Sequence, residues 1–391
     1  SVIELERWDD GWRIVAPVKG DADDAQVEKF LGYVIESRND AEYVMDADPS
    51  PERLTEFGLD VPKNVVTLKV GKELTPYTLE FGDRAPTMGV AFARLKGQRQ
   101  VYRVLADAQA EADRDLYYFR DKRALKIDPV GIDQLSLTWD DQQLLVKMPD
   151  NGKWTVEKPV KATADHMRVF ELLSAFSTAE VKEFTDRPAT ADPAFGLDAP
   201  MAKMLIWVAG DGAPTIQLAV GKRDPAKRGY YCLVTGHEGV VVLSEETINA
   251  LPRKPSDLRN REIFPFDQTL VRRIEIRTAS SQVALVMDKE SEWRRGGDAG
   301  EVVEFQKVKE FTDELAAVKV VDFVEGGATR RSEVGLTPPE MELVVWLEGE
   351  KEPHRLTVGH RDPTGALRYA GLGDEVVTIE RRFAQALVSY F

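Results

Sequence analysis

The sequence predicts an α+β fold made of three tandem modules, each a mostly antiparallel sheet with one main packed helix and a short terminal helix. Two observations support this prediction. Ordered motifs recur with a period of about 139 residues, and each repeat combines strands of alternating polarity with one amphipathic helical stretch. The predicted modules are residues 1–128, which lack the opening strand, 129–267, and 268–391, which lack the C-terminal segment.

The repeat is visible in four motifs. Trp12, Trp154 and Trp293 mark corresponding points of the three copies. A Gly-Leu-x-x-Pro block follows each tryptophan, and a Gly-x-Arg-x-Pro block comes next. A fourth segment, Phe-Arg-Asp-Lys-Arg, is matched one repeat period later by Leu-Arg-Asn-Arg-Glu. The Gly-Leu-x-x-Pro block lies in residues 57–62, 195–200 and 334–339. The Gly-x-Arg-x-Pro block lies in residues 82–86, 221–225 and 359–363. The fourth segment occupies residues 119–123 and 258–262.

The middle repeat shows which elements to expect. Val169, Leu172, Leu173 and Phe176 have the spacing of one helix face, and Asp165 is suited to cap that helix. Asp192-Pro193 begins a short helical turn, which Gly196 can end by adopting a left-handed conformation. Alternating apolar residues predict strands on both sides of the helix, and a short helix is expected at about 245–251.

Composition limits the possible functions. The formal net charge is -15, from 52 Lys+Arg against 67 Asp+Glu, and such a charge repels phosphate backbones and anionic lipid headgroups. Cys232 is the single cysteine, so no intramolecular disulfide is possible, which fits a cytoplasmic or a periplasmic protein. No apolar run reaches the length of a membrane-spanning helix.

No catalytic or metal-binding signature is recognisable, and we expect no cofactor and no enzymatic activity. The four histidines lack the spacing of metal ligands, and Cys232 in an apolar strand is expected to be a buried structural residue. The repeated Arg84, Arg223 and Arg361 are the candidate contacts for an anionic ligand or a partner. The alternative, which we favour, is that each arginine anchors its own loop by bonding backbone carbonyls or stacking on the following aromatic residue.

The order of these motifs resembles an uncharacterised bacterial domain-of-unknown-function family. Its members are tandem-repeat proteins found beside gliding-motility-type ABC transporter auxiliary proteins. The resemblance covers nearly the whole chain and rests mainly on Phe-Gly-Leu-Asp-x-Pro at residues 57–62 and 195–200. It implies an N-terminal membrane anchor with the repeats outside the cytoplasm, and it supplies no catalytic residues.

Two functions are consistent with these features. The first is a non-enzymatic extracytoplasmic scaffold or protein-interaction module, an accessory part of an ABC-type transport or envelope complex whose partners include transporter subunits. The alternative is a binding module for an envelope glycan or an anionic small ligand. Because the first repeat opens at the second strand of its hairpin, we also expect that upstream residues were left out, either a membrane anchor or a disordered leader.

Overall fold

The computed structural model describes residues 2–36, 44–86, 89–139, 142–149, 152–210, 212–297 and 299–389. The chain divides into two compact units. Unit 1 comprises Ser1–Asp141 and Leu172–Leu251, and unit 2 comprises Gln142–Glu171 and Pro252–Phe391. The described strands form four sheets in which the recorded pairs are antiparallel, and eight α-helices are described with them. This confirms the predicted α+β class.

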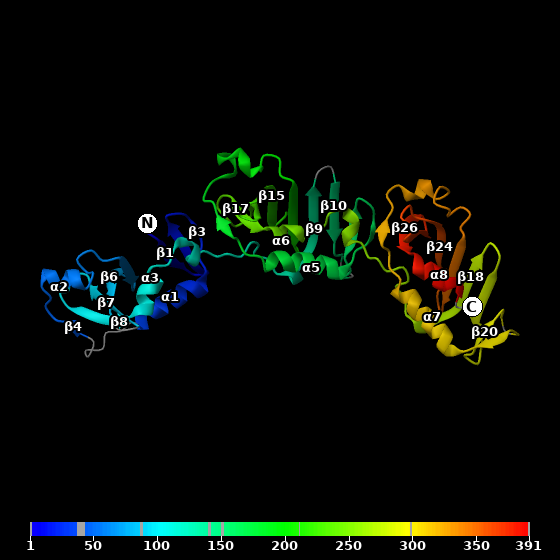
Figure 1. Ribbon diagram of the computed structural model, residues 1–391, viewed down its shortest axis with the longest axis horizontal. Coiled ribbons are helices and arrows are strands. Elements are labelled where there is room, and N and C mark those ends of the chain that lie inside the picture. Colours follow the sequence, from blue (N-terminus) through cyan, green and yellow to red (C-terminus); the bar gives the residue numbers. More distant parts are fainter. Residues whose placement is uncertain are drawn as a thin grey trace. The chain divides into compact units, whose positions relative to one another are not determined.

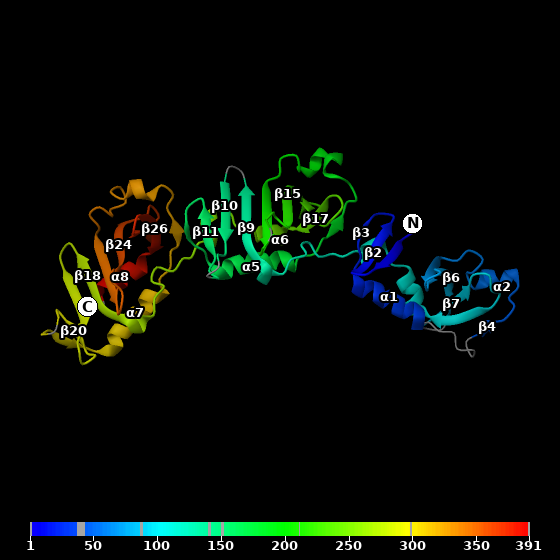
Figure 2. The ribbon, with the colours of Figure 1, turned by 180° about the vertical axis from the view of Figure 1, so that it is seen from behind.

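Residues 1–128, which we call the first segment, contain two separate sheets. A three-stranded sheet has the order β1-β2-β3, and a five-stranded sheet has the order β4-β8-β7-β6-β5. Both views of the ribbon show β1–β3 apart from β6–β8 (Figures 1 and 2). The strands are β1 Glu4–Trp8, β2 Gly11–Ala16, β3 Gly20–Asp21, β4 Val44–Asp46, β5 Asn64–Val70, β6 Thr75–Arg84, β7 Val90–Leu95 and β8 Val101–Leu105.

The second segment (129–267) and the third segment (268–391) each contain a nine-stranded sheet. The orders are β12-β11-β10-β9-β14-β15-β16-β17-β13 and β21-β20-β19-β18-β23-β24-β25-β26-β22, which correspond strand for strand. The second segment has β9 Ile132–Trp139, β10 Gln142–Lys147, β11 Thr155–Lys158, β12 Ala162–Thr163, β13 Glu183–Phe184, β14 Ala202–Val208, β15 Ile216–Asp224, β16 Gly229–Val234 and β17 Val241–Ser244. The third has β18 Val271–Thr278, β19 Gln282–Met287, β20 Trp293–Arg295, β21 Glu301–Val303, β22 Asp322–Phe323, β23 Met341–Leu347, β24 His354–Arg361, β25 Leu367–Leu372 and β26 Glu375–Glu380.

One main helix lies in each segment at the predicted position. The α-helices are α1 Asp24–Glu36, α2 Pro51–Glu56, α3 Ala106–Ala112, α4 Leu116–Phe119, α5 His166–Ser177, α6 Glu245–Asn249, α7 Phe305–Ala317 and α8 Arg381–Ser389. The predicted apolar face of α5 is buried, and Asp165 accepts a hydrogen bond from the backbone N–H of Arg168, as expected of an N-cap. Within the described ranges, no helix combines the length and the apolar character needed to cross a membrane.

The two glycine motifs meet in space, which explains why both recur. The Gly-Leu glycines adopt left-handed conformations, with φ of 68°, 65° and 74° at Gly58, Gly196 and Gly335. The carbonyl oxygen of the residue before each one then lies against the glycine of the Gly-x-Arg motif. A Cβ on Gly221 would lie 2.1 Å from the oxygen of Phe195, so only glycine fits.

A β-bulge accompanies this contact in all three segments. The register shifts between Phe81 and Arg84, between Val220 and Arg223, and between Val358 and Arg361. The bulge inserts one extra residue into the strand just before the motif arginine, which interrupts the alternation of side chains and bends the strand. The Gly-x-Arg motif therefore encodes a bend in the sheet together with a backbone contact.

We expect Gly221→Ala to lower the free energy of unfolding by about 2–4 kcal/mol, because the added methyl group collides with a backbone oxygen that cannot move independently. Gly32→Ala is the matched control. It lies inside α1 with open space around the added atom, so it should be neutral or stabilise by up to about 1 kcal/mol. Urea denaturation of both variants measures the difference, and equal effects would contradict the close approach.

Candidate functional site

The fourth repeated motif forms a linker that is hydrogen-bonded on both sides. In unit 1, residues 119–124 pair with residues 21–23 just before α1, and with residues 179–181 just after α5. The bonds run from Asp23 N to Phe119 O (2.8 Å), from Asp121 N to Asp21 O (3.0 Å), from Val181 N to Lys122 O (2.7 Å) and from Ala124 N to Ala179 O (2.7 Å). Segments far apart in sequence are therefore joined through one extended stretch of backbone.

A buried arginine sits at the centre of this linker. The guanidinium of Arg120 lies over the ring of Phe184, 4.4 Å from its centroid, and its Nη2 donates to Asp186 Oδ1 at 2.5 Å. Arg120 is only 7% exposed, so its charge is stabilised by the ring face and the carboxylate rather than by water. We call Arg120, Phe184 and Asp186 the first junction.

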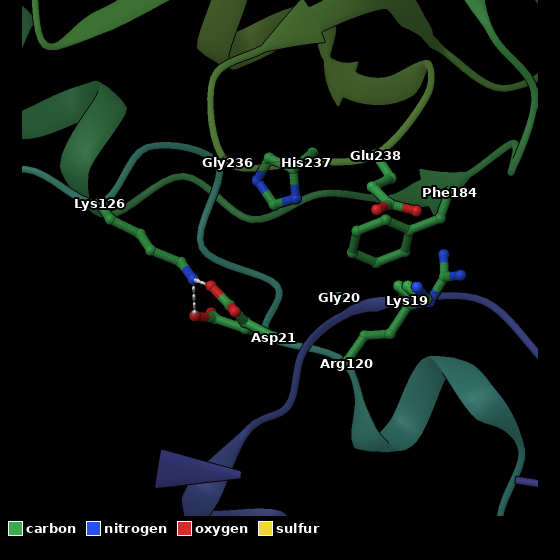
Figure 3. Close-up of a pocket in the computed structure, with 10 residues that line it drawn as sticks. Lys19, Gly20, Asp21, Arg120, Lys126, Phe184, Gly236, His237 and Glu238 are labelled. Carbon is green, nitrogen blue, oxygen red and sulfur yellow. Dashed lines mark hydrogen bonds and ion pairs between the residues drawn. The ribbon is translucent and has the colours of Figure 1, made fainter. Parts of the chain in front are cut away.

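Charged side chains surround the first junction (Figure 3). Lys126 donates to Asp21 and also lies 3.0 Å from Asp121. Burial disfavours the ionised form of Asp121, but hydrogen bonds from Arg123 and Lys126 outweigh this effect and lower its pKa to about 2. Asp121 is therefore an anion at neutral pH that pairs with Arg123 of its own linker and with Lys126 just beyond it.

His237 covers the other side of the linker. Its Nε2 lies 3.0 Å from the carbonyl oxygen of Arg123 and 3.1 Å from that of Ala124, so this nitrogen carries the proton and donates to both. Burial lowers the pKa of His237, although the two carbonyls oppose that shift. The histidine thus binds the linker backbone as a neutral donor, and its ring centroid lies 5.8 Å from that of Phe184.

The same arrangement recurs in unit 2, one repeat period further along the chain. Arg259 lies over Phe323 at 3.8 Å from the centroid and pairs with Glu375. We call these three residues the second junction. The backbone bonds are repeated as well: Asp165 N to Leu258 O (2.8 Å), Asn260 N to Thr163 O (2.9 Å) and Val320 N to Arg261 O (2.8 Å). The carboxylate comes from a different position in each junction, whereas the arginine, the phenylalanine and the backbone bonds correspond.

The cavity at the first junction is too small for a substrate. Its volume is about 30 Å³, and it is lined by Arg120, Lys126, Phe184 and His237 among others. That space holds one or two water molecules. Across the residues described, no three His, Cys, Asp or Glu side chains gather in a way that could hold a metal ion. The hydrogen bonds at this site attach one backbone segment to two others.

The three arginines singled out from the sequence do not share one environment. Arg84 Nε donates to Gln109 in α3 at 3.0 Å, and Arg223 pairs with Glu245 in the first turn of α6 at 2.7 Å. Arg361 is exposed at the end of β24. Two of them thus bind a side chain of a following helix, in the middle of α3 and at the start of α6. Their role as contacts for a ligand or a partner stays a prediction.

Sequence reasoning quoted the motif that contains Arg120 and Arg259 but did not assign it a role. The partners Phe184 and Phe323 follow these arginines at one and the same spacing, and they are themselves one repeat period apart. That double recurrence was the available signal. It could not identify a contact, because many residue pairs in a repeated sequence share the same spacing.

A family model described as a domain of unknown function (DUF4340) matches residues 12–200 and 154–339. The chain belongs to this family. The two matches begin at Trp12 and Trp154 and overlap, so one DUF4340 unit runs past a single repeat and includes a linker with its arginine and phenylalanine. No curated protein and no solved structure matches the chain. DUF4340 membership therefore establishes a repeated domain but brings no activity with it.

We expect Asp121→Asn to reduce stability by about 2 kcal/mol at neutral pH, from a pKa of about 2 in the folded protein against 3.8 ordinarily. Because the folded-state pKa is the lower one, this stabilisation is present above pH 3.8 and is lost as the pH falls toward 2. Asn260 occupies the matching position in the second junction and still accepts from the backbone N–H of Glu262, so the amide preserves the turn. Unfolding free energies between pH 7 and about pH 2 test this. The exposed Asp60→Asn is the control and should change stability by less than about 0.5 kcal/mol.

We expect Arg120→Ala to destabilise unit 1 by about 2 kcal/mol and to accelerate exchange of the hydrogen-bonded amides of Asp121 and Ala124, because Asp186 and the face of Phe184 lose their partner. The stability of Arg120→Lys should lie between those of the wild type and Arg120→Ala, since lysine keeps the charge but not the planar stacking. The control is Arg99→Ala, which removes an exposed ion pair with Asp48 and should cost less than about 0.5 kcal/mol. If Arg99→Ala and Arg120→Ala behave alike, the junction is not a stabilising contact.

Proposed function

We propose that this DUF4340 protein is a non-enzymatic scaffold outside the cytoplasm, built from three tandem modules and acting as an accessory part of an ABC-type transport or envelope complex. The observation that carries the proposal is the recurrence of the junction in two successive repeats, with the same arginine, phenylalanine and backbone bonds. Contacts that repeat in this way attach segments to one another. They serve a protein whose role is to hold surfaces in a fixed order.

The distribution of polar groups supports the same proposal. The buried charged side chains of the described residues are all paired with other side chains of the protein: Glu80 with Arg94, Glu111 with Arg114, Arg120 with Asp186, Asp121 with Arg123 and Glu275 with Arg273. The pKa of Asp121 is lowered by Arg123 of the same linker and by Lys126 just beyond it. Catalytic sites place perturbed groups so that they face a substrate cavity, whereas Asp121 is paired with two cations beside a space of only about 30 Å³.

The modular part of the proposal rests on the sheets. The second and third segments have the same strand order, and in both segments β-bulges and glycine contacts occur at the positions of the repeated motifs. The first segment keeps the bulge and the glycine contact and divides its strands between two sheets. Three modules of one kind, the first with its strands divided between two sheets, account for all of these features.

Affinity capture from envelope extracts tests the scaffold. The wild-type protein, the double junction variant Arg120→Ala with Arg259→Ala, and the control Arg99→Ala would each be used as bait in cells that lack the native copy. We expect wild type and control to recover permease or ATPase subunits of one ABC transporter, and the junction variant to recover less while keeping its circular dichroism spectrum. Recovery of no protein above the background of the untagged strain would overturn the scaffold. Recovery of envelope proteins unrelated to a transporter would overturn the ABC assignment.

A further inference from the structure

The five-stranded sheet of the first segment ends in an edge that its counterparts do not have. β5 is the last strand in the order β4-β8-β7-β6-β5. In the other two segments the corresponding strands, β14 and β23, are paired on that side with β9 and β18. Unit 1 thus contains one sheet in which this strand is an open edge and one in which the edge is filled by a further strand. Unit 2 contains a second sheet with a filled edge.

The filled cases show what the edge of β5 lacks. Met204 and Ile206 of β14 are buried opposite Leu137 and Leu135 of β9. Leu343 and Val345 of β23 are buried in the same way opposite Ile276 and Ile274 of β18. Counted from the Gly-Leu glycine of each motif, the positions equivalent to Met204 and Ile206 in β5 are Val66 and Leu68. In the second and third segments, two apolar side chains of the neighbouring strand, β9 or β18, cover the corresponding positions.

In the first segment these positions line an apolar cavity instead. Val66 and Leu68 are only partly buried and face a space of about 210 Å³ whose walls also come from β6, β7, β8 and the end of α1. The lining is aliphatic and aromatic, completed by Val34, Ile35, Leu79 and Tyr77 among others. Water inside such a lining finds few hydrogen-bond partners, so the cavity favours an apolar occupant.

β1 is the second strand with an open edge, and its apolar side chain is also less buried than its counterpart in the second segment. β1 is an edge strand, and its ladder with β2 shifts register between Glu4 and Leu5, as the ladder of β10 with β11 does between Leu145 and Val146. This common irregularity aligns Leu5 with Val146. Val146 is fully buried, whereas Leu5 is partly buried. The side chains of Glu4 in β1 and Lys69 in β5 form an ion pair at 3.5 Å, so the two edges lie within reach of each other.

We propose that the open edges of β1 and β5, which together with the cavity beside β5 we call the groove, form an acceptor site for a single β-strand with the apolar alternation of β9 and β18, joined to the start of β1 by a short turn. Its backbone pairs with β5 on one side and β1 on the other, and two apolar side chains enter the cavity beside Val66 and Leu68. The joint to β1 follows from the filled cases, in which β9 precedes β10 and β18 precedes β19 across two or three residues. An occupied groove unites the two sheets of the first segment into one sheet of nine strands in the order of the other two.

The test uses the chain's own strand. In the alignment that matches Leu5 with Val146, Ser1 corresponds in sequence to Gln142. Residues 132–141, Ile-Asp-Gln-Leu-Ser-Leu-Thr-Trp-Asp-Asp, would therefore be fused directly ahead of Ser1. We expect amide exchange in β5 to slow at least tenfold, because N–H groups that point away from β6 gain partners. The matched control carries Leu135→Asp and Leu137→Asp in the grafted copy only. No slowing in β5, or equal slowing with both grafts, overturns the proposal.

Two further arms test the register and the tether. Cysteines at Val66→Cys and, in the grafted copy, Leu137→Cys should form a disulfide on mild oxidation, whereas Thr67→Cys, one residue along β5, should not because its side chain points to the opposite face. Linkage at Thr67 instead overturns the register. A free ten-residue peptide of the same sequence, added to the ungrafted protein, should protect β5 only at large molar excess, because a tethered strand has a high effective concentration. Full protection at one equivalent would overturn the tether and assign the groove to a strand from another chain.

Discussion

The backbone pairing of residues 119–124 with the chain on both of their sides is the constraint on which the arrangement of unit 1 depends. A buried N–H or C=O without a partner costs free energy comparable to a lost hydrogen bond. The linker meets this requirement by acting as a strand between residues 21–23 and residues 179–181. Once its register is set, Arg120 falls over Phe184 and His237 falls above two carbonyl groups. The side-chain contacts follow from the ladder.

Magnitudes indicate why an arginine occupies this position. A surface ion pair contributes about 0–1 kcal/mol, and burying a charge costs several kcal/mol unless it is paired. Arg120 spreads its charge over a ring face and a carboxylate, which offsets that cost, and its planar group stacks where an ammonium would not. The gain in stability is small, but loss of one partner leaves a buried charge uncompensated. We expect such a contact to discriminate against wrong pairings of segments as well as to stabilise the right one.

The features predictable from the sequence were those with local causes. Helix faces, the cap at Asp165 and the left-handed Gly196 follow from the spacing and chemistry of neighbouring residues. The edge strands β4, β13 and β22 were not predicted, because two or three residues cannot show a period. The contacts of the two junctions were not predicted for a different reason. Arg120 and Phe184 are separated by a whole helix, and their contact depends on a ladder that no local pattern encodes.

The widths of the nine-stranded sheets contrast with the lengths of their outermost strands. β12 and β13 have two residues each, and β21 and β22 have three and two. A long, flat outer strand offers its unpaired N–H and C=O groups to any other chain and invites fibre growth. Tapering each sheet to a few residues leaves almost no such template, and the linker occupies the backbone next to β13 and β22. This tapering protects the two nine-stranded sheets from extension by a neighbouring molecule under crowded conditions, whereas the seven-residue edge of β5 has no such protection.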